Sequence, residues 1–254
     1  MQIVEKFCET KYGRICYLEI GSGEKPLVYL HGWSGNPVPA IKLAYRLGPN
    51  YKIIAPYLPG HGKSFDINSS FNFQNLLITL EDFFNKLSLK NVVAIGHSVG
   101  GISVYELANS GNGLINKAVV IDGYNNFRHT NLIGLLPLIW AVFKENGYWS
   151  SLMHTTSYRF AKSIKIGKIK RSALFQEGSM IKTLIPSRFN PKSNPMKNYL
   201  LIWGKRDMLT PETEWLKQTR ISRSRVVEFN GGHCWCVMHL NHTWPVIEKF
   251  IKDK

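Results

Sequence analysis

The sequence predicts an α/β protein built on a mostly parallel sheet, and three observations lead to this fold class. Short apolar runs of strand length alternate along the chain with segments of helical periodicity. Most of the runs are apolar at successive positions, as is typical of strands buried on both faces of a sheet. A glycine-rich turn at Gly96–Gly101 joins one run directly to a helical segment. With 254 residues, the chain is long enough to bury a core of this kind.

Six apolar runs are the expected parallel strands, and helices are expected on both faces of their sheet. In chain order the runs are Leu27–Leu30, Ile53–Ala55, Val92–Ile95, Ala118–Ile121, Leu200–Trp203 and Val226–Phe229. The expected helices include Phe73–Leu87, Gly101–Ser110 and Pro211–Thr219, the last with Thr210 as its N-cap. Runs at Ile3–Phe7 and Ile15–Ile20 flank a turn, which predicts an antiparallel hairpin at one sheet edge.

The alternation of strands and helices breaks between Gly123 and Lys197, where helical patterns continue without a clear strand. Residues 124–197 hold 12 lysines and arginines against two glutamates, a net charge of +10 out of +15 for the whole chain. We interpret 124–197 as a helical cap inserted into a core formed by residues 1–123 and 198–254. The proline-containing stretch 190–195 is its expected exit linker.

Composition narrows the class of protein further. Hydrophobic residues make up 44% of the chain and aromatic residues 12%, which excludes intrinsic disorder. No apolar run approaches the roughly 20 residues of a membrane span, and the first residues lack the pattern of a secretory signal. Four cysteines are too few for a disulfide scaffold, so reduced thiols and a cytoplasmic location are expected. The positive charge indicates an acidic partner or surface, or else a solvated basic face.

The strongest chemical signal is the pattern Gly-x-Ser-x-Gly around Ser98, directly after the expected strand Val92–Ile95. Small residues on both sides of the serine allow a sharp turn, which lifts the hydroxyl out at the carboxyl edge of the sheet. The turn also sets Ser98 at the start of a helix, whose dipole favours developing negative charge. Ser98 is therefore the candidate nucleophile. The alternative is an ordinary glycine-rich connection between a strand and a helix.

A serine hydroxyl needs an adjacent base, and that base needs a carboxylate to orient it. His233 follows a glycine pair after the last expected strand and is the best candidate for the base. Asp207 follows Leu200–Trp203 at the same edge and is the favoured acid. Asp122, just after Ala118–Ile121, is its rival, since either acid gives the chain order Ser, Asp, His.

Two backbone amides are expected to hold the oxyanion, those of Val99 and Trp33. For the substrate itself the expected contacts are Trp33, His97, Leu136 and Trp140. The last two belong to the apolar run 132–143, which is interpreted as a buried cap helix, the lining of an acyl pocket or a surface that touches membrane.

The motifs together resemble those of the α/β-hydrolase superfamily, in order and spacing. They are Leu30–Trp33, Pro59–Ser64, Gly96–Gly101, Trp203–Asp207 and Gly231–His233. The chain is most similar to small serine esterases with a helical lid, a group that includes the pimeloyl-carrier-protein methyl ester esterases. The resemblance implies an eight-stranded sheet with an antiparallel second strand, and the roles of nucleophile, acid and base for Ser98, Asp207 and His233. One departure is Tyr57, where the family commonly has aspartate.

These features predict a serine hydrolase that cleaves a carboxylic ester or thioester without a cofactor or metal. A carbon–carbon bond hydrolase, a lipase, an acyltransferase or a non-catalytic ligand-binding protein on the same fold are the alternatives. A zinc site at His233, Cys234, Cys236 and His239 is disfavoured because no second cysteine pair lies nearby. The expected partner is a small or carrier-bound acyl ester, with an acidic acyl carrier protein or an anionic lipid surface as candidates. Nucleic acid is not expected, because the basic segment has few aromatic residues among its lysines.

Overall fold

A computed structural model describes residues 1–32, 35–68, 70–123, 198–207, 212, 216 and 225–253. Several sequence predictions lie outside these residues. They are the cap at 124–197 with Leu136 and Trp140, the oxyanion donor Trp33, and most of the helix expected at 211–219. Of that last segment Glu212 and Leu216 are described, and both are helical.

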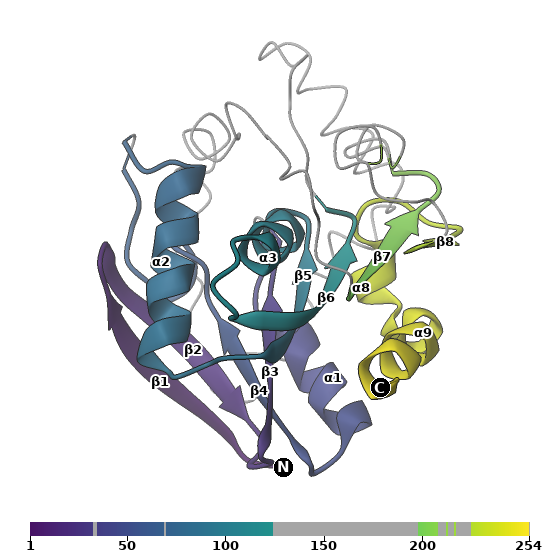
Figure 1. Cartoon of the computed structure of the whole chain (residues 1–254), viewed down its shortest axis with the longest axis horizontal. Helices are drawn as coiled ribbons and strands as arrows, with labels where there is room; N and C mark the ends of the chain where they lie inside the picture. Colours follow the sequence, from purple (N-terminus) through teal and green to yellow (C-terminus); the bar gives the residue numbers. More distant parts are fainter. Residues whose placement is uncertain are drawn as a thin grey trace.

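Within the described residues, eight strands form one sheet in the order β1-β2-β4-β3-β5-β6-β7-β8 (Figure 1). Their bounds are β1 (Ile3–Thr10), β2 (Gly13–Ile20), β3 (Lys25–Leu30), β4 (Tyr51–Pro56), β5 (Val92–His97), β6 (Ile115–Ile121), β7 (Tyr199–Gly204) and β8 (Val226–Phe229). Strand β2 runs antiparallel to both of its neighbours, and every other pairing is parallel. This confirms the mostly parallel eight-stranded sheet and its antiparallel second strand.

Helices cover both faces of the sheet, as predicted. Helices α2 (Phe73–Lys86) and α3 (Val99–Asn109) pack on one face, whereas α1 (Val38–Leu47) and α9 (Leu240–Lys252) pack on the other (Figure 1). The short helix α8 (Trp235–Met238) precedes α9 and belongs to the same side. Sequence reasoning anticipated α2 and α3 but did not assign α1, α8 or α9.

The strands supply apolar side chains to two separate cores. Val28 and Leu30 of β3 contact the core beneath α2 and α3, while Leu27 and Tyr29 of the same strand contact the core beneath α1 and α9. All four side chains are buried, which explains why the run is apolar at successive positions. Because β3, β5, β6 and β7 are parallel, the loops that follow them gather at one edge of the sheet.

The loop at Tyr57 shows how the chain accommodates its departure from the family pattern. Tyr57 is buried, and its ring lies against Gly62, where a Cβ atom would come within 2.4 Å of the ring. The Ser64 hydroxyl donates to the Tyr57 carbonyl at 2.6 Å and accepts from the Cys16 amide at 2.9 Å. The loop is therefore held by the packing of Tyr57 and by hydrogen bonds of the Ser64 side chain to the backbone.

Two further sequence predictions concern disulfide bonds and membrane-spanning helices. None of the four cysteines forms a disulfide, and in the N-terminal hairpin Cys8 pairs with Ile15 rather than with Cys16. Among the described helices, none has the length and apolar character needed to cross a membrane.

Candidate functional site

Ser98 occupies a strained turn between β5 and α3. It is the N-cap of α3 with φ +53° and ψ −117°, a conformation that L side chains rarely adopt. The Ser98 amide donates to the Ile121 carbonyl of the neighbouring strand β6 at 3.0 Å, and the Ser98 carbonyl accepts from Ile102 in the first turn of α3. These bonds hold the hydroxyl at the carboxyl edge of the sheet, as the sequence pattern predicts.

The glycines of the Gly-x-Ser-x-Gly pattern are required by close backbone approach. A Cβ atom on Gly96 would lie 2.2 Å from the Gly100 carbonyl oxygen. A Cβ atom on Gly100 would lie 2.2 Å from the carbonyl oxygen of Leu30 in β3. Neither backbone can yield without moving a central strand, so both positions demand glycine.

The three residues predicted as nucleophile, base and acid meet in one hydrogen-bonded chain. Ser98 Oγ lies 2.9 Å from His233 Nε2, and His233 Nδ1 lies 2.8 Å from Asp207 Oδ2. All three residues are buried. The carboxylate can only accept, so Nδ1 carries the hydrogen and Nε2 is left to accept from the serine hydroxyl. This is the tautomer that a general base acting on Ser98 requires.

Backbone hydrogen bonds tie the loop that carries Asp207 to the loop that carries His233. The Asp207 amide closes its own turn by donating to the Gly204 carbonyl at 2.9 Å. The Arg206 amide donates to the carbonyl of Gly231, two residues before the histidine, at 2.9 Å. Asp207 and His233 are therefore held at a fixed separation by the main chain.

His97, which the sequence predicts as a substrate contact, makes a hydrogen bond to the loop that carries His233. Its Nε2–H donates to the His233 carbonyl at 2.9 Å, and the two ring centroids lie 5.0 Å apart. Sequence reasoning missed this supporting contact, because it joins residues 136 positions apart.

Asp122, the rival acid, makes a different set of contacts. Its Oδ1 accepts from the Gly204 amide at 2.7 Å, and its carboxyl also shares a hydrogen bond with the Cys236 thiol. Its backbone adopts a φ of +45° and its side chain is fully buried. Burial, and then the charge of Asp207, raise the pKa of Asp122 well above its usual value. The Asp122 side chain thus joins the ends of β6 and β7, whereas the Asp207 carboxylate accepts the hydrogen bond from the His233 imidazole.

Of the two predicted oxyanion donors, Val99 lies within the described residues. Val99 is the first residue of α3, where amides have no partner within the helix. Trp33 lies outside the described residues, but the preceding Gly32 lies against Ser98. A Cβ atom on Gly32 would come within 2.7 Å of His97 Nδ1 and 3.1 Å of Ser98 Cβ.

The buried side chain of His31 fixes the turn at Gly32. His31 Nδ1–H donates to the Gly32 carbonyl at 2.6 Å, and His31 Nε2 accepts from the Leu58 amide at 3.0 Å. Burial, and then the neighbouring His61, lower the pKa of His31 well below its usual value. His31 is therefore neutral, and it joins the loop after β3 to the loop after β4.

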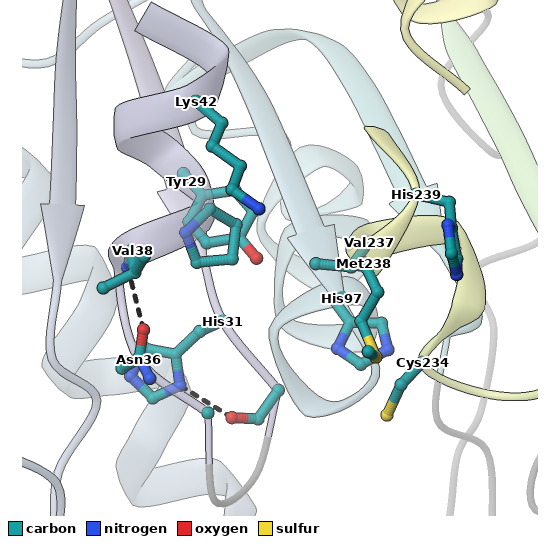
Figure 2. A pocket seen from close by; sticks show the side chains of 13 residues that line it. Tyr29, His31, Asn36, Val38, Lys42, His97, Cys234, Val237, Met238 and His239 are labelled. Carbon is teal, nitrogen blue, oxygen red and sulfur yellow. Dashed lines mark hydrogen bonds between the residues drawn. The ribbon is translucent and has the colours of Figure 1, made fainter. Parts of the chain in front are cut away.

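A cavity of about 190 Å³ lies beside these loops, between β3, α1 and α8 (Figure 2). Among the four residues predicted to contact substrate, His97 lines this cavity and the other three lie outside the described residues. In the part of the chain that the structure describes, no three histidine, cysteine or carboxylate side chains are grouped as metal ligands.

A comparison with known protein families matches residues 27–242 to the alpha/beta hydrolase family. The matched stretch contains all the loops described above and most of the chain. The chain belongs to the α/β-hydrolase family. Membership accounts for the strand order, the sharp turn at Ser98 and the gathering of Asp207 and His233 at one edge of the sheet.

Individual relatives of this α/β-hydrolase chain match over shorter stretches. A Mycoplasma pneumoniae protein named for esterase or lipase activity is 42% identical over 79 residues, 30% of this chain and 28% of its own length. The pimeloyl-[acyl-carrier protein] methyl ester esterase of Vibrio vulnificus is 26% identical over 178 residues, 68% of this chain and 64% of its own length. The chain thus matches less than two thirds of either relative.

Solved structures resemble the chain over nearly all of its length. An E-2-(acetamidomethylene)succinate hydrolase superposes with a TM-score of 0.72 and 19% identity, covering 99% of this chain and 100% of that protein. At this level of identity the likeness establishes the fold.

Proposed function

We propose that this α/β-hydrolase chain is a serine hydrolase that cleaves a carboxylic ester or thioester through an acyl-enzyme intermediate. The proposal rests on the hydrogen bonds between Ser98 Oγ and His233 Nε2, at 2.9 Å, and between His233 Nδ1 and Asp207 Oδ2, at 2.8 Å. The strained backbone at Ser98 supports it, since such strain clusters at functional sites.

In the proposed reaction, Ser98 Oγ attacks the carbonyl carbon of the ester while His233 Nε2 takes the hydroxyl proton. Asp207 stabilises the resulting imidazolium, and the amides of Val99 and Trp33 donate to the oxyanion. As the tetrahedral intermediate collapses, His233 gives its proton to the departing alcohol or thiol. A water molecule, deprotonated by His233, then attacks the acyl-enzyme and releases the carboxylic acid, which restores the Ser98 hydroxyl.

The printed names of two relatives favour an ester as the substrate. Esterase or lipase activity is assigned to the Mycoplasma pneumoniae protein, and a methyl ester is the substrate of the Vibrio vulnificus enzyme. A carbon–carbon bond hydrolase, a lipase, an acyltransferase and a ligand-binding protein on this fold remain the alternatives. A cytoplasmic location belongs to the proposal, since none of the four cysteines forms a disulfide.

A panel of p-nitrophenyl esters of increasing acyl length, together with acyl thioesters, tests the reaction class. We expect turnover of short esters by the wild-type chain and none above background by Ser98→Ala. Turnover would exclude a purely ligand-binding role. An inactive wild-type chain whose Ser98 also fails to react with a fluorophosphonate would overturn the proposal.

We further propose that the natural substrate is presented on an acidic surface, with an acyl carrier protein as the favoured presenter. The net charge of +10 in the sequence of residues 124–197 supports this, as does the carrier-linked substrate in the name of the Vibrio vulnificus relative. Attraction of this kind is screened over about 8–10 Å at physiological salt and acts on association, so it changes kcat/KM more than kcat.

Reversing Lys165, Lys168 and Lys170 to glutamate tests the role of this charge. Hydrolysis of a neutral small ester should be equal in the variant and the wild type. An ester on an acidic carrier should lose kcat/KM in the variant, and also in the wild type as salt rises. A loss only with anionic lipid vesicles would replace the carrier by a membrane surface. No difference between substrates would show that the charge has no role in recognition.

A further inference from the structure

The cavity between β3, α1 and α8 contains a buried hydroxyl group that takes no part in the hydrogen bonds described above. Tyr29 of β3 is only 2% exposed and lines this cavity. Within the described residues its hydroxyl makes no hydrogen bond, although a buried phenol normally has a partner. Burial raises the pKa of Tyr29, so the hydroxyl keeps its proton and is available as a donor. An acceptor atom on a bound ligand would give this hydroxyl a hydrogen-bond partner.

A cation faces the same space from helix α1. Lys42 lines the cavity, and Figure 2 shows its ammonium group on the same side as the Tyr29 hydroxyl, opposite Val237 and Met238 of α8. Asn36 also lines the cavity. Its Oδ1 accepts from the Val38 amide at 2.9 Å, so its side-chain NH₂ group is the end that can donate to a ligand. No aspartate or glutamate occurs among the described lining residues. The donors and the charge together favour an anion.

The remaining polar groups of the lining add no competing charge. Both nitrogens of His31 are engaged by backbone groups, and His97 Nε2 donates to the His233 carbonyl. Burial lowers the pKa of His239, which favours its neutral form. Lys42 is therefore the principal charge that faces the cavity among the described residues.

The size of the cavity limits the ligand. Its volume of about 190 Å³ is below the roughly 300–1,000 Å³ of sites for drug-sized ligands. Its other walls are apolar, formed by side chains such as Val38, Val237 and Met238. A short aliphatic chain that ends in a carboxylate matches both the walls and the donors.

The cavity adjoins the triad but is not the pocket at the nucleophile. Gly32, His97 and Cys234 line it, and the side chains of Ser98 and His233 do not. Gly32 and His97 line the cavity and also neighbour Ser98, since a Cβ atom on Gly32 would lie 3.1 Å from Ser98 Cβ. A ligand here would touch the residues that flank nucleophile and base without displacing the ester.

We propose that this cavity is a second ligand site, which binds a small aliphatic carboxylate through Lys42 and Tyr29. The inference goes beyond the proposed hydrolysis, and it does not depend on turnover. The carboxylate accepts from the Tyr29 hydroxyl and pairs with the Lys42 ammonium, while its alkyl chain packs against α8. The site explains why a buried phenol and a lysine face one cavity with no acidic partner in its described lining.

Cys234 provides a reporter of occupancy. It lines the cavity and is partly exposed, while the other three cysteines are buried. The rate at which neutral iodoacetamide alkylates Cys234, read by peptide mass spectrometry, is measured with butyrate, with butyramide and with inorganic phosphate. The Ser98→Ala variant is used so that no acyl-enzyme forms. Butyrate at ten times its Kd should slow alkylation about tenfold, and butyramide should not.

Single substitutions connect this protection to the proposed contacts. Lys42→Met keeps the aliphatic stem and Tyr29→Phe keeps the ring, and each should weaken butyrate protection roughly tenfold or more. The exposed Lys90, at the opposite end of the sheet, supplies the matched control Lys90→Met. In this variant butyrate should protect Cys234 as well as it does without the substitution. Lys42 is a surface residue, so its variant is expected to fold.

Several outcomes would overturn the second site. Equal protection by butyramide, protection by phosphate but not by butyrate, or full protection in both Lys42→Met and Tyr29→Phe would each do so. Wild-type protein blocked at Ser98 by a fluorophosphonate provides the last arm. Protection should persist there, and its loss would mean that butyrate binds at the nucleophile instead. The alkylation rates measured on the Ser98→Ala variants need no turnover, so a failure of the proposed hydrolysis would leave those readouts unaffected.

Discussion

Asp122 and Asp207 follow adjacent parallel strands and reach the same edge of the sheet, yet they take part in different contacts. Strands β6 and β7 pair in register from Ala118 with Tyr199 to Ile121 with Ile202, so their ends are neighbours. Both carboxyls are buried. Asp207 bonds to the imidazole of His233, whereas Asp122 bonds to the Gly204 backbone. Position at a strand end supplies candidate acids, and the contact with imidazole selects between them.

The residues that directly follow β5 and β6 both have a strained backbone. Ser98 has a φ of +53° and Asp122 a φ of +45°, and each amide donates across to the next strand. Such conformations cost on the order of 1–3 kcal/mol each. At Ser98 the strained turn presents a hydroxyl to His233. At Asp122 it turns a carboxyl inward, where it joins two strand ends.

The largest expected effect comes from removing the nucleophile. Ser98→Ala should lower kcat for a p-nitrophenyl ester by roughly 10⁴–10⁶, because members of a triad fail together. His233→Ala should have nearly the same effect. Steady-state kinetics with matched circular dichroism spectra test this. A Ser98→Ala chain that retained a tenth of the wild-type kcat would contradict the assignment.

Asp207→Asn is expected to have the next largest effect. The amide can hold the imidazole in the wrong tautomer and cannot stabilise imidazolium, so kcat should fall about 10⁴-fold. A parallel measurement on Asp122→Asn gives the direct comparison. Loss of activity in Asp122→Asn with activity retained in Asp207→Asn would transfer the acid role to Asp122.

Asp122→Asn itself should reduce kcat by less than about tenfold. Asparagine has the shape of a protonated carboxyl and keeps an oxygen that accepts from the Gly204 amide. It therefore preserves the link between β6 and β7. Comparison of kcat for Asp122→Asn and Asp122→Ala isolates this link, since alanine leaves the buried amide without its acceptor.

The smallest expected effect is on the pH dependence of stability. The pKa of Asp122 is raised by folding, so the folded chain holds a proton that the unfolded chain releases above about pH 4. The free energy of unfolding then falls as pH rises from about 4 towards the raised folded pKa. Asp122→Asn removes this slope, by up to about 1.4 kcal/mol per pH unit.

Urea unfolding between pH 4.5 and 7 measures that slope. The exposed Asp253 provides the control Asp253→Asn, which should leave the slope as in wild type. A steeper fall of stability with pH in Asp122→Asn would contradict a raised pKa for Asp122.

Much of the fold and of the triad was predictable from sequence, because both depend on local patterns. Runs such as Ala118–Ile121 are apolar at every position, and the structure buries each residue on one face or the other of the sheet. The glycines around Ser98 point to a turn that no larger residue could form. Parallel strands then bring the residues after each strand to one edge, which predicted the meeting of Ser98, Asp207 and His233.

Other features depend on contacts between distant segments and left no local signal. Asp122 and Asp207 have the same sequence setting, and what distinguishes them is a hydrogen bond to a loop 26 residues beyond Asp207. The hydrogen bond from His97 to the His233 carbonyl could not be predicted from the neighbours of His97 in sequence. The cavity beneath Lys42 and Tyr29 arises where β3, α1 and α8 meet, and two of these three elements were not assigned from sequence.

Fluorophosphonate labelling, followed by peptide mass spectrometry, tests most directly whether Ser98, His233 and Asp207 act as one unit. We expect a single adduct on Ser98 in the wild-type chain. We also expect nearly wild-type labelling in Asp122→Asn and strongly slowed labelling in Asp207→Asn and His233→Ala, because the probe reports the nucleophilicity that the base confers. An adduct on another residue, or fast labelling in Asp207→Asn with slow labelling in Asp122→Asn, would contradict this assignment.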